Sequence, residues 1–209
     1  MAVPRDRLVT YLDQYLEIDG WEEKALNGLQ VEGAPEVTRV ALATDAALAT
    51  FAMAAEAEAG FLIVHHGLFW GSVQAIVGPR RARIAALLDA GISLYAAHLP
   101  LDAHPGVGNN AVLARLLKLE NLTPFGRWGT RSIGWRGALA EPTDRAALAA
   151  GLEALLGARP DVLPFGTDEI RSVAIVSGAA ADLVSEAAQS GVDAFVTGET
   201  SHVAWHHAR

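Results

Sequence analysis

The chain has 209 residues, of which 51% are hydrophobic, enough for one large or two small cores. Its 24 acidic residues outnumber the 16 lysines and arginines, so the net charge is -8 and we expect no nucleic-acid binding through phosphate neutralisation. The absence of cysteine excludes disulfides, thiolate-bound zinc, iron–sulfur clusters and a thiol nucleophile.

The first residues and the hydropathy pattern bear on location. Charged side chains at Arg5, Asp6, Arg7 and Asp13 argue against a signal peptide. The sequence contains no run of 18 uncharged apolar residues, so we expect no membrane span. Together with the missing cysteines, this predicts a cytoplasmic protein.

Apolar strands alternate with helices in the first part of the chain. We predict strands over residues 40–44, 61–65 and 92–97, and helices over 46–59, 78–90 and 109–118. Continuous apolar strands of this kind are typical of a largely parallel sheet covered on both faces. The predicted fold class is therefore α/β.

A second region of the chain resembles the first. Residues 39–45 match residues 171–177, and each segment precedes a predicted helix, 46–59 or 179–190, that stops at a glycine. This pattern indicates a duplicated α/β lobe, although any two strand–helix–strand units share some of it. Between the copies we predict a strand over 133–139 and a helix over 144–156, with Thr143 as its N-cap.

The repeat sets the expected domain organisation. We predict a first α/β lobe over residues 1–123, a small connecting lobe over 124–165 and a second α/β lobe over 166–209. The second lobe continues through a predicted helix over 200–209 but has no strand that matches 92–97. We therefore expect that it lacks a C-terminal piece, which would supply ligands at the position matching Asp102.

Two adjacent histidines, His65 and His66, close the apolar strand 61–65 just before Gly67. Ligands of α/β proteins bind where strands leave the sheet, and neutral imidazole is the commonest metal ligand. Neighbouring side chains on a strand point in opposite directions, so this pair suits two neighbouring metal ions better than one. The alternative is a hydrogen-bonded pair that only caps the strand.

His98 and Asp102 follow the next predicted strand, 92–97. In a parallel sheet the two strand ends share one edge, so His65, His66 and Asp102 are expected to converge as metal ligands. Imidazole and carboxylate groups suit zinc, manganese or iron(II), and three protein ligands leave positions open for water. His98 is expected to donate a hydrogen bond to a ligating carboxylate without binding the metal itself, and His104 is expected to be an ordinary loop residue.

Three further patterns give weaker indications of a functional site. His202 and His206 share a helix face, which we interpret as a polar face rather than a zinc site. Glu199 has two open interpretations: a carboxylate that stabilises the start of a helix, or a residue that faces the metal site. Residues 106–111 match G-x-G-x-x-A, but Pro100 to Pro105 separate them from a strand, so we interpret them as a turn with Asn109 as a helix cap. No serine-hydrolase elbow or Walker loop is present.

Four motifs in order along the chain resemble the NIF-three-like dinuclear metal-centre proteins, often labelled GTP cyclohydrolase 1 type 2 homologs. They are Asn27 to Val31, Ile63 to Gly67, Leu101-Asp102 with Gly106 to Asn110, and Thr197 to Glu199. The resemblance implies two related α/β lobes, a hexamer and two divalent metal ions, with His65, His66 and Asp102 among the ligands. It also implies a C-terminal histidine and glutamate that this sequence does not contain.

These observations support more than one function. The first is a metal-dependent hydrolase of a small nucleotide-like or phosphorylated substrate, in which the ions activate a shared water. No general acid is assigned, and His98 and Glu199 are candidates only. The second is a non-enzymatic protein that binds or delivers metal or recruits partners, and the third is a structural oligomer with vestigial sites. In each case we expect a homo-oligomer.

Overall fold

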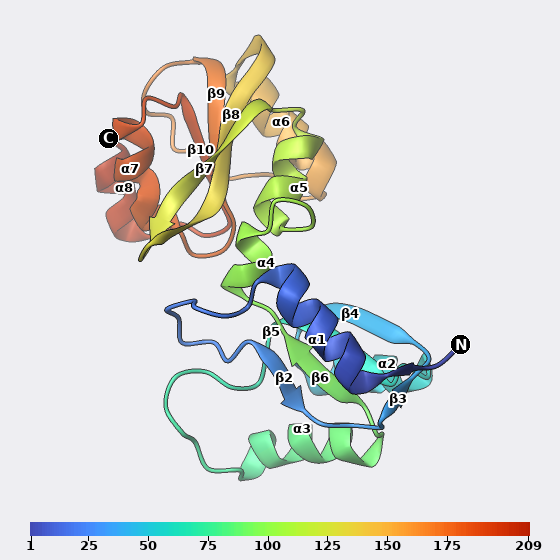
Figure 1. The fold of residues 1–209 in the computed structure, drawn as a ribbon. Coiled ribbons are helices and arrows are strands. Elements are labelled where there is room, and N and C mark those ends of the chain that lie inside the picture. The colour runs from blue at the N-terminus through green and yellow to red at the C-terminus, as the bar shows by residue number, and fades with distance from the viewer. The chain divides into compact units, whose positions relative to one another are not determined.

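The computed structural model describes all residues 1–209, which divide into two compact units, Met1–Leu101 and Asp102–Arg209 (Figure 1). This division differs from the expected ranges 1–123, 124–165 and 166–209. Residues 120–128 pair with residues 131–144, and these pair in turn with a strand beginning at Glu169. The range 124–165 therefore contributes strands to the second unit's sheet and is not a lobe of its own.

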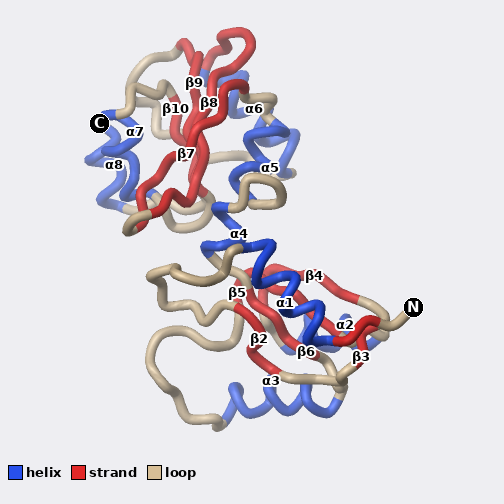
Figure 2. The backbone as a smooth tube through the Cα atoms, viewed as in Figure 1, coloured by secondary structure: helices blue, strands red, loops and turns tan.

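The first unit is built on a four-stranded sheet in the order β2-β6-β5-β4 (Figure 2). The strands β4, β5 and β6 are parallel, as predicted, and β2 is antiparallel to β6. The elements are β1 (Val3–Pro4), α1 (Arg5–Leu16), β2 (Gly28–Val31), β3 (Glu36–Val37), β4 (Val40–Asp45), α2 (Leu48–Glu56), β5 (Phe61–His66), α3 (Gly78–Asp89) and β6 (Ser93–Ala96). The helix α4 (Leu99–Ala103) follows.

Both faces of β5 and β6 are covered, which explains why these two strands are apolar along most of their length, whereas Leu42 of the edge strand β4 is 79% exposed. Leu62 and Leu94 pack with Phe51 of α2 on one face, while Phe61 and Tyr95 belong to the core cluster that α1 joins on the other. Fully burying one such side chain stabilises a fold by about 1.5–3 kcal/mol. Alternate residues of β5 and β6 thus supply two cores, and this holds the strand ends in place.

The second unit has a four-stranded sheet in the order β10-β9-β8-β7. Its elements are α5 (Asn109–Leu116), β7 (Glu120–Trp128), β8 (Arg131–Asp144), α6 (Arg145–Leu156), β9 (Glu169–Val176), the 3-10 turn η1 (Ala181–Leu183), α7 (Val184–Gln189), β10 (Ala194–Thr197) and α8 (His202–Ala208). Helices α5 and α6 lie on one side of the sheet and α7 and α8 on the other (Figure 1).

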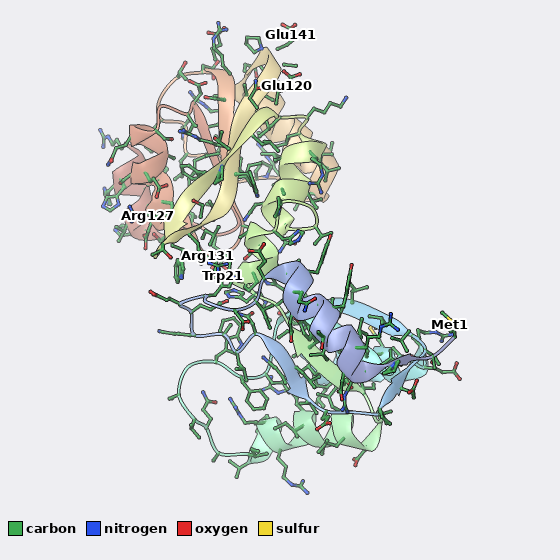
Figure 3. All side chains as sticks on the ribbon, in the orientation of Figure 1. Met1, Trp21, Glu120, Arg127, Arg131 and Glu141 are labelled. Atoms are coloured by element: carbon green, nitrogen blue, oxygen red, sulfur yellow. The ribbon has the colours of Figure 1, made fainter.

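Parallel pairing in this second sheet is limited to β9 and β10, the two strands of the predicted repeat. The strand β8 is antiparallel to both β7 and β9, so the expectation of a largely parallel sheet fails here. For β7 and β8 the reason is local, because a short turn joins them and a tight turn permits only antiparallel pairing. The strands β8 and β9 are connected through α6, so their antiparallel direction does not follow from a local turn. In Figure 3, Arg127 and Arg131 mark the turn end of this hairpin, and Glu120 and Glu141 mark its other end.

Two predicted helix caps are corrected. Asp144, not Thr143, caps α6, and its Oδ1 accepts a hydrogen bond of 2.7 Å from the backbone N–H of Ala147. Gly108 takes the cap position of α5, so Asn109 is the first helical residue and its side chain is used elsewhere. None of the helices combines the length and the hydropathy that crossing a lipid bilayer would require.

Candidate metal centre

The carboxyl ends of the three parallel strands form one edge of the first sheet. Asp45 of β4 is the register partner of His66 in β5, and His98 lies two residues beyond the last residue of β6. Because β2 is antiparallel, its first residue, Gly28, lies at this same edge. The topology therefore also brings the segment before β2, which carries Glu23 and Asn27, to the histidines.

Three histidines form a cluster at this edge. One nitrogen of each of His65, His66 and His98 lies within 4.8 Å of the other two. The ring centroids of His65 and His66 are 4.6 Å apart, although neighbouring residues within a strand point to opposite faces. The strand ends at His66, and at this end the two rings come close together. The His98 centroid lies 4.9 Å from that of His65.

A buried carboxylate fixes the ring of His98. The Glu23 side chain is only 3% exposed, and its Oε2 lies 2.5 Å from Nδ1 of His98. Its Oε1 accepts hydrogen bonds from Asn27 Nδ2 at 2.7 Å and from the backbone N–H of Leu99 at 3.3 Å. Since a carboxylate only accepts, Nδ1 of His98 is the donor, and in the neutral imidazole the lone pair is then on Nε2.

His66 repeats this arrangement closer to solvent. Its Nδ1 lies 2.8 Å from Oδ1 of Asp45, and the two side chains are 44% and 66% exposed. A carboxylate on the outer nitrogen is the usual support of a metal-binding histidine, because it fixes the tautomer and strengthens the ligand. The donor set of the cluster therefore fits a divalent metal ion such as zinc, manganese or iron(II).

The segment after β5 packs tightly beside the cluster. Trp70 donates from Nε1 to the carbonyl oxygen of Gly67 at 2.8 Å, and its ring centroid lies 4.9 Å from that of His98. Gly67 has no room for a side chain, since a Cβ there would lie 2.3 Å from Nε2 of Gln30. Gln30 in turn accepts at Oε1 from the backbone N–H of Leu68 at 2.7 Å.

Asp102 lies in α4 at the start of the second unit and is 6% exposed. Its Oδ1 accepts hydrogen bonds from Asn109 Nδ2 at 2.8 Å and from Ser177 Oγ at 3.0 Å. The fully buried Asn110 donates to the carbonyl oxygens of Asp102 and Ile133. The structure thus shows how Asp102 is oriented, and its convergence with His65 and His66 stays a prediction.

The remaining candidates have plainer roles. Nδ1 of His104 accepts from the backbone N–H groups of Gly106 and Val107 at 3.0 and 3.1 Å, so it shapes a loop as predicted. His202 and His206 lie on one exposed face of α8 with ring centroids 5.1 Å apart. Glu199 is exposed just beyond β10, and its backbone N–H donates to Gly178.

Sequence reasoning missed part of this centre. It placed His98 outside the ligand set, whereas the structure groups His98 with His65 and His66. It also missed Glu23, which is separated from His98 by 75 positions. No spacing rule connects residues so far apart. The segment from Glu23 to the Asn27-Gly28 pair has the composition of an ordinary surface turn, so nothing in it indicates a buried carboxylate.

Comparison with known proteins gives a consistent match. The family model Duf34/NIF3 (NGG1p interacting factor 3) matches residues 3–209. A Deinococcus radiodurans protein named "GTP cyclohydrolase 1 type 2 homolog" is 43% identical over 98% of this chain and 78% of its own length. An Archaeoglobus fulgidus protein of the same name is 44% identical over 97% of this chain and 80% of its own.

Solved structures agree with these sequence matches. The crystal structure of TTHA1606 from Thermus thermophilus superposes with a TM-score of 0.89 and 45% identity, covering 98% of this chain and 81% of that one. The protein ybgI, described as of unknown function, gives a TM-score of 0.89 at 37% identity over 99% of this chain and 83% of its own.

Proposed function

Because this chain belongs to the Duf34/NIF3 family, we propose that it binds two divalent metal ions and hydrolyses a small nucleotide-like or phosphorylated substrate. One observation carries the proposal: three imidazoles gather at the sheet edge, and two of them have carboxylates on their outer nitrogens. The name shared by the relatives, "GTP cyclohydrolase 1 type 2 homolog", supports a nucleotide-like substrate.

We assign His65, His66 and Asp102 as metal ligands, with His98 as a further candidate. When bound, a divalent ion supplies Lewis-acid polarisation of the scissile group and lowers the pKa of a coordinated water. Zinc, manganese and iron(II) all match these ligands. The resemblance further supports a homohexamer in the cytoplasm, which we include in the proposal.

Two carboxylates keep the protons of the cluster's histidines in place. Glu23 accepts the hydrogen bond from Nδ1 of His98, and Asp45 accepts the one from Nδ1 of His66. Only Nε2 of His98 is then available, so His98 either binds a metal ion or transfers a proton, but not both at once. The Trp70 ring meets the His98 ring in a T-shaped contact, with the centroids 4.9 Å apart.

A second function has its own support. The His66 side chain is 44% exposed, and an accessible ligand favours exchange of the metal with solvent or a partner. This fits a non-enzymatic protein that binds or delivers metal. The two functions share one site and differ in whether bound substrate is turned over.

The proposal is tested by elemental analysis and turnover assays of the full chain, with His65→Ala and the double variant His65→Ala/His66→Ala. His206→Ala is the matched control, because His206 lies on α8 outside the cluster. We expect metal loss in the cluster variants only, together with loss of manganese- or zinc-dependent hydrolysis of nucleotides. Bound metal without turnover would favour the delivery function, whereas equal metal content in all variants would overturn the site.

A further inference from the structure

We propose that a pocket beside the histidine cluster binds a small molecule in which a flat aromatic ring is joined through a sugar to a phosphate group, as in a nucleoside monophosphate. The inference deepens the proposed function, on which it rests, by assigning the part of the site that recognises the substrate. It uses residues outside the metal cluster and can be tested without metal.

The pocket lies within the first unit and has a volume of about 520 Å³. It is formed by the segment before β2, the segment that follows β5 and the first turn of α3, where Arg80 lies. Small-molecule sites usually measure about 300–1,000 Å³, and the volume of this pocket lies in that range.

Two half-buried aromatic side chains, Phe69 and Trp70, line the pocket. The indole N–H of Trp70 is already bonded to the carbonyl oxygen of Gly67, so this side chain offers the pocket its ring and not its donor. Aromatic rings contribute stacking or edge-to-face contacts to planar ligands. This chemistry favours a planar aromatic ring over a flexible aliphatic chain.

Positive charge lies in the same lining, at Arg80 and Lys24. The Arg80 guanidinium carbon lies 5.6 Å from the Phe69 ring centroid, and the guanidinium donates to Oε1 of Gln74. Both partners are neutral, so the charge of Arg80 is not neutralised by a carboxylate. Arginine in this setting suits a phosphate, with which it forms paired charge-assisted hydrogen bonds.

Two residues that line the pocket also contact His98 of the histidine cluster. Glu23 lines the pocket and also bonds Nδ1 of His98, and the Trp70 ring lies 4.9 Å from the His98 ring between centroids. A ligand bound between Trp70 and Arg80 therefore lies next to the proposed metal centre. This proximity makes the pocket a recognition site for the substrate and not a remote surface hollow.

The test measures binding by isothermal titration calorimetry to the full chain after metal removal with a chelator. Four probes separate the contributions: AMP has ring and phosphate, adenosine has only the ring, ribose 5-phosphate has only the charge and sugar, and inorganic phosphate has only the anion. We expect AMP to bind most tightly. Ribose 5-phosphate binding as tightly as AMP would overturn the role of the ring, and no AMP binding would overturn the pocket.

Arg80→Gln tests the charge and Arg81→Gln is its control, since Arg81 is exposed on the same helix and is not part of the pocket. Losing a charged hydrogen bond should weaken AMP binding about tenfold or more. Adenosine binding should not change in either variant. Equal AMP affinity in Arg80→Gln and the wild type would contradict the assignment of Arg80.

The same titration in His65→Ala/His66→Ala separates this inference from the proposed function. AMP should bind this variant as it binds the metal-free wild type. If AMP binds but no metal-dependent hydrolysis is found, the hydrolase proposal fails and the pocket stands. If hydrolysis is found and AMP does not bind, the pocket assignment fails alone.

Discussion

Oε2 of Glu23 lies 2.5 Å from Nδ1 of His98, and this contact joins the segment before β2 to the end of β6. It fixes the orientation and the tautomer of an imidazole in the histidine cluster. Because Glu23 is only 3% exposed and also bonds Asn27 and Leu99, the carboxylate has little freedom to move. Glu23 is thus the positioning residue of the centre.

Glu23→Gln should weaken metal binding about 10–100-fold, the usual effect of losing such a support. The amide oxygen can keep the bonds from Asn27 and Leu99, but the amide nitrogen donates to Nδ1 of His98. That bond moves the ring proton to Nε2, which can then no longer bind a metal ion. Zinc affinity measured by competition with a chromophoric chelator checks this.

The control for this change is Glu56→Gln, on an exposed position of α2. Asp45→Asn gives an internal comparison, because its bond to His66 is exposed to solvent and should matter less than that of Glu23. Unchanged zinc affinity in Glu23→Gln, with the protein still folded, would show that His98 is not a ligand.

The hydrogen bonds to Asp102 give a way to test its proposed role as a ligand. Asn109→Ala and Ser177→Ala each remove one donor to Oδ1, and the double variant removes both. We expect the double variant to lose metal affinity by more than either single change. The thermal unfolding midpoint is measured alongside. A loss of stability without any loss of metal affinity would show that Asp102 has only a structural role.

Gly67 and Gly151 should respond oppositely to alanine. At Gly67 the new Cβ would lie 2.3 Å from the Gln30 amide and 2.7 Å from Cβ of Ala96, so we expect a loss of about 1–3 kcal/mol in unfolding free energy. Gly151 lies inside α6 with nothing within 4 Å, so alanine there should stabilise by about 0.5–1 kcal/mol.

Urea unfolding of the two variants checks these signs. Gly67→Ala should also lower metal affinity, because Gly67 directly follows His66 and accepts the bond from Trp70. A Gly67→Ala protein as stable as the wild type would mean that the loop after β5 can shift without strain.

Asp193 should make the second unit sensitive to acid. Burial alone would raise the pKa of Asp193, but hydrogen bonds from the backbone N–H groups of Arg171 and Ser172 and from the Ser172 hydroxyl lower it overall. A carboxyl group with a lowered pKa stabilises the fold above its unfolded pKa of about 3.9. This contribution is lost as the pH falls through the folded-state pKa.

We therefore expect Asp193→Ala to lower the unfolding free energy by about 1–3 kcal/mol at pH 7, where three donors lose a charged acceptor. The gap between variant and wild type should narrow at pH 3. Urea unfolding at both pH values measures it, and a gap of the same size at both would show that the charge of Asp193 contributes nothing.

The sequence by itself determined the elements whose patterns are local. The apolar runs at β4, β5 and β6 and the glycines after the helices located the parallel strands. For β5 and β6 the physical reason is burial on both faces, which demands continuous apolar residues. The pair His65-His66 could be placed at the end of β5 because it directly follows the apolar run of that strand. The predicted metal site rested on these strand ends.

Only the tertiary structure decided what depends on contacts between distant residues. The bond of Glu23 to His98 and the antiparallel pairing of β8 with β9 join segments that no local periodicity relates. Strand direction follows from which strands pair, and a buried carboxylate is recognised only once its partners surround it. A sequence pattern indicates which residues of one element are buried, whereas the strands and side chains that they contact depend on how the whole chain packs.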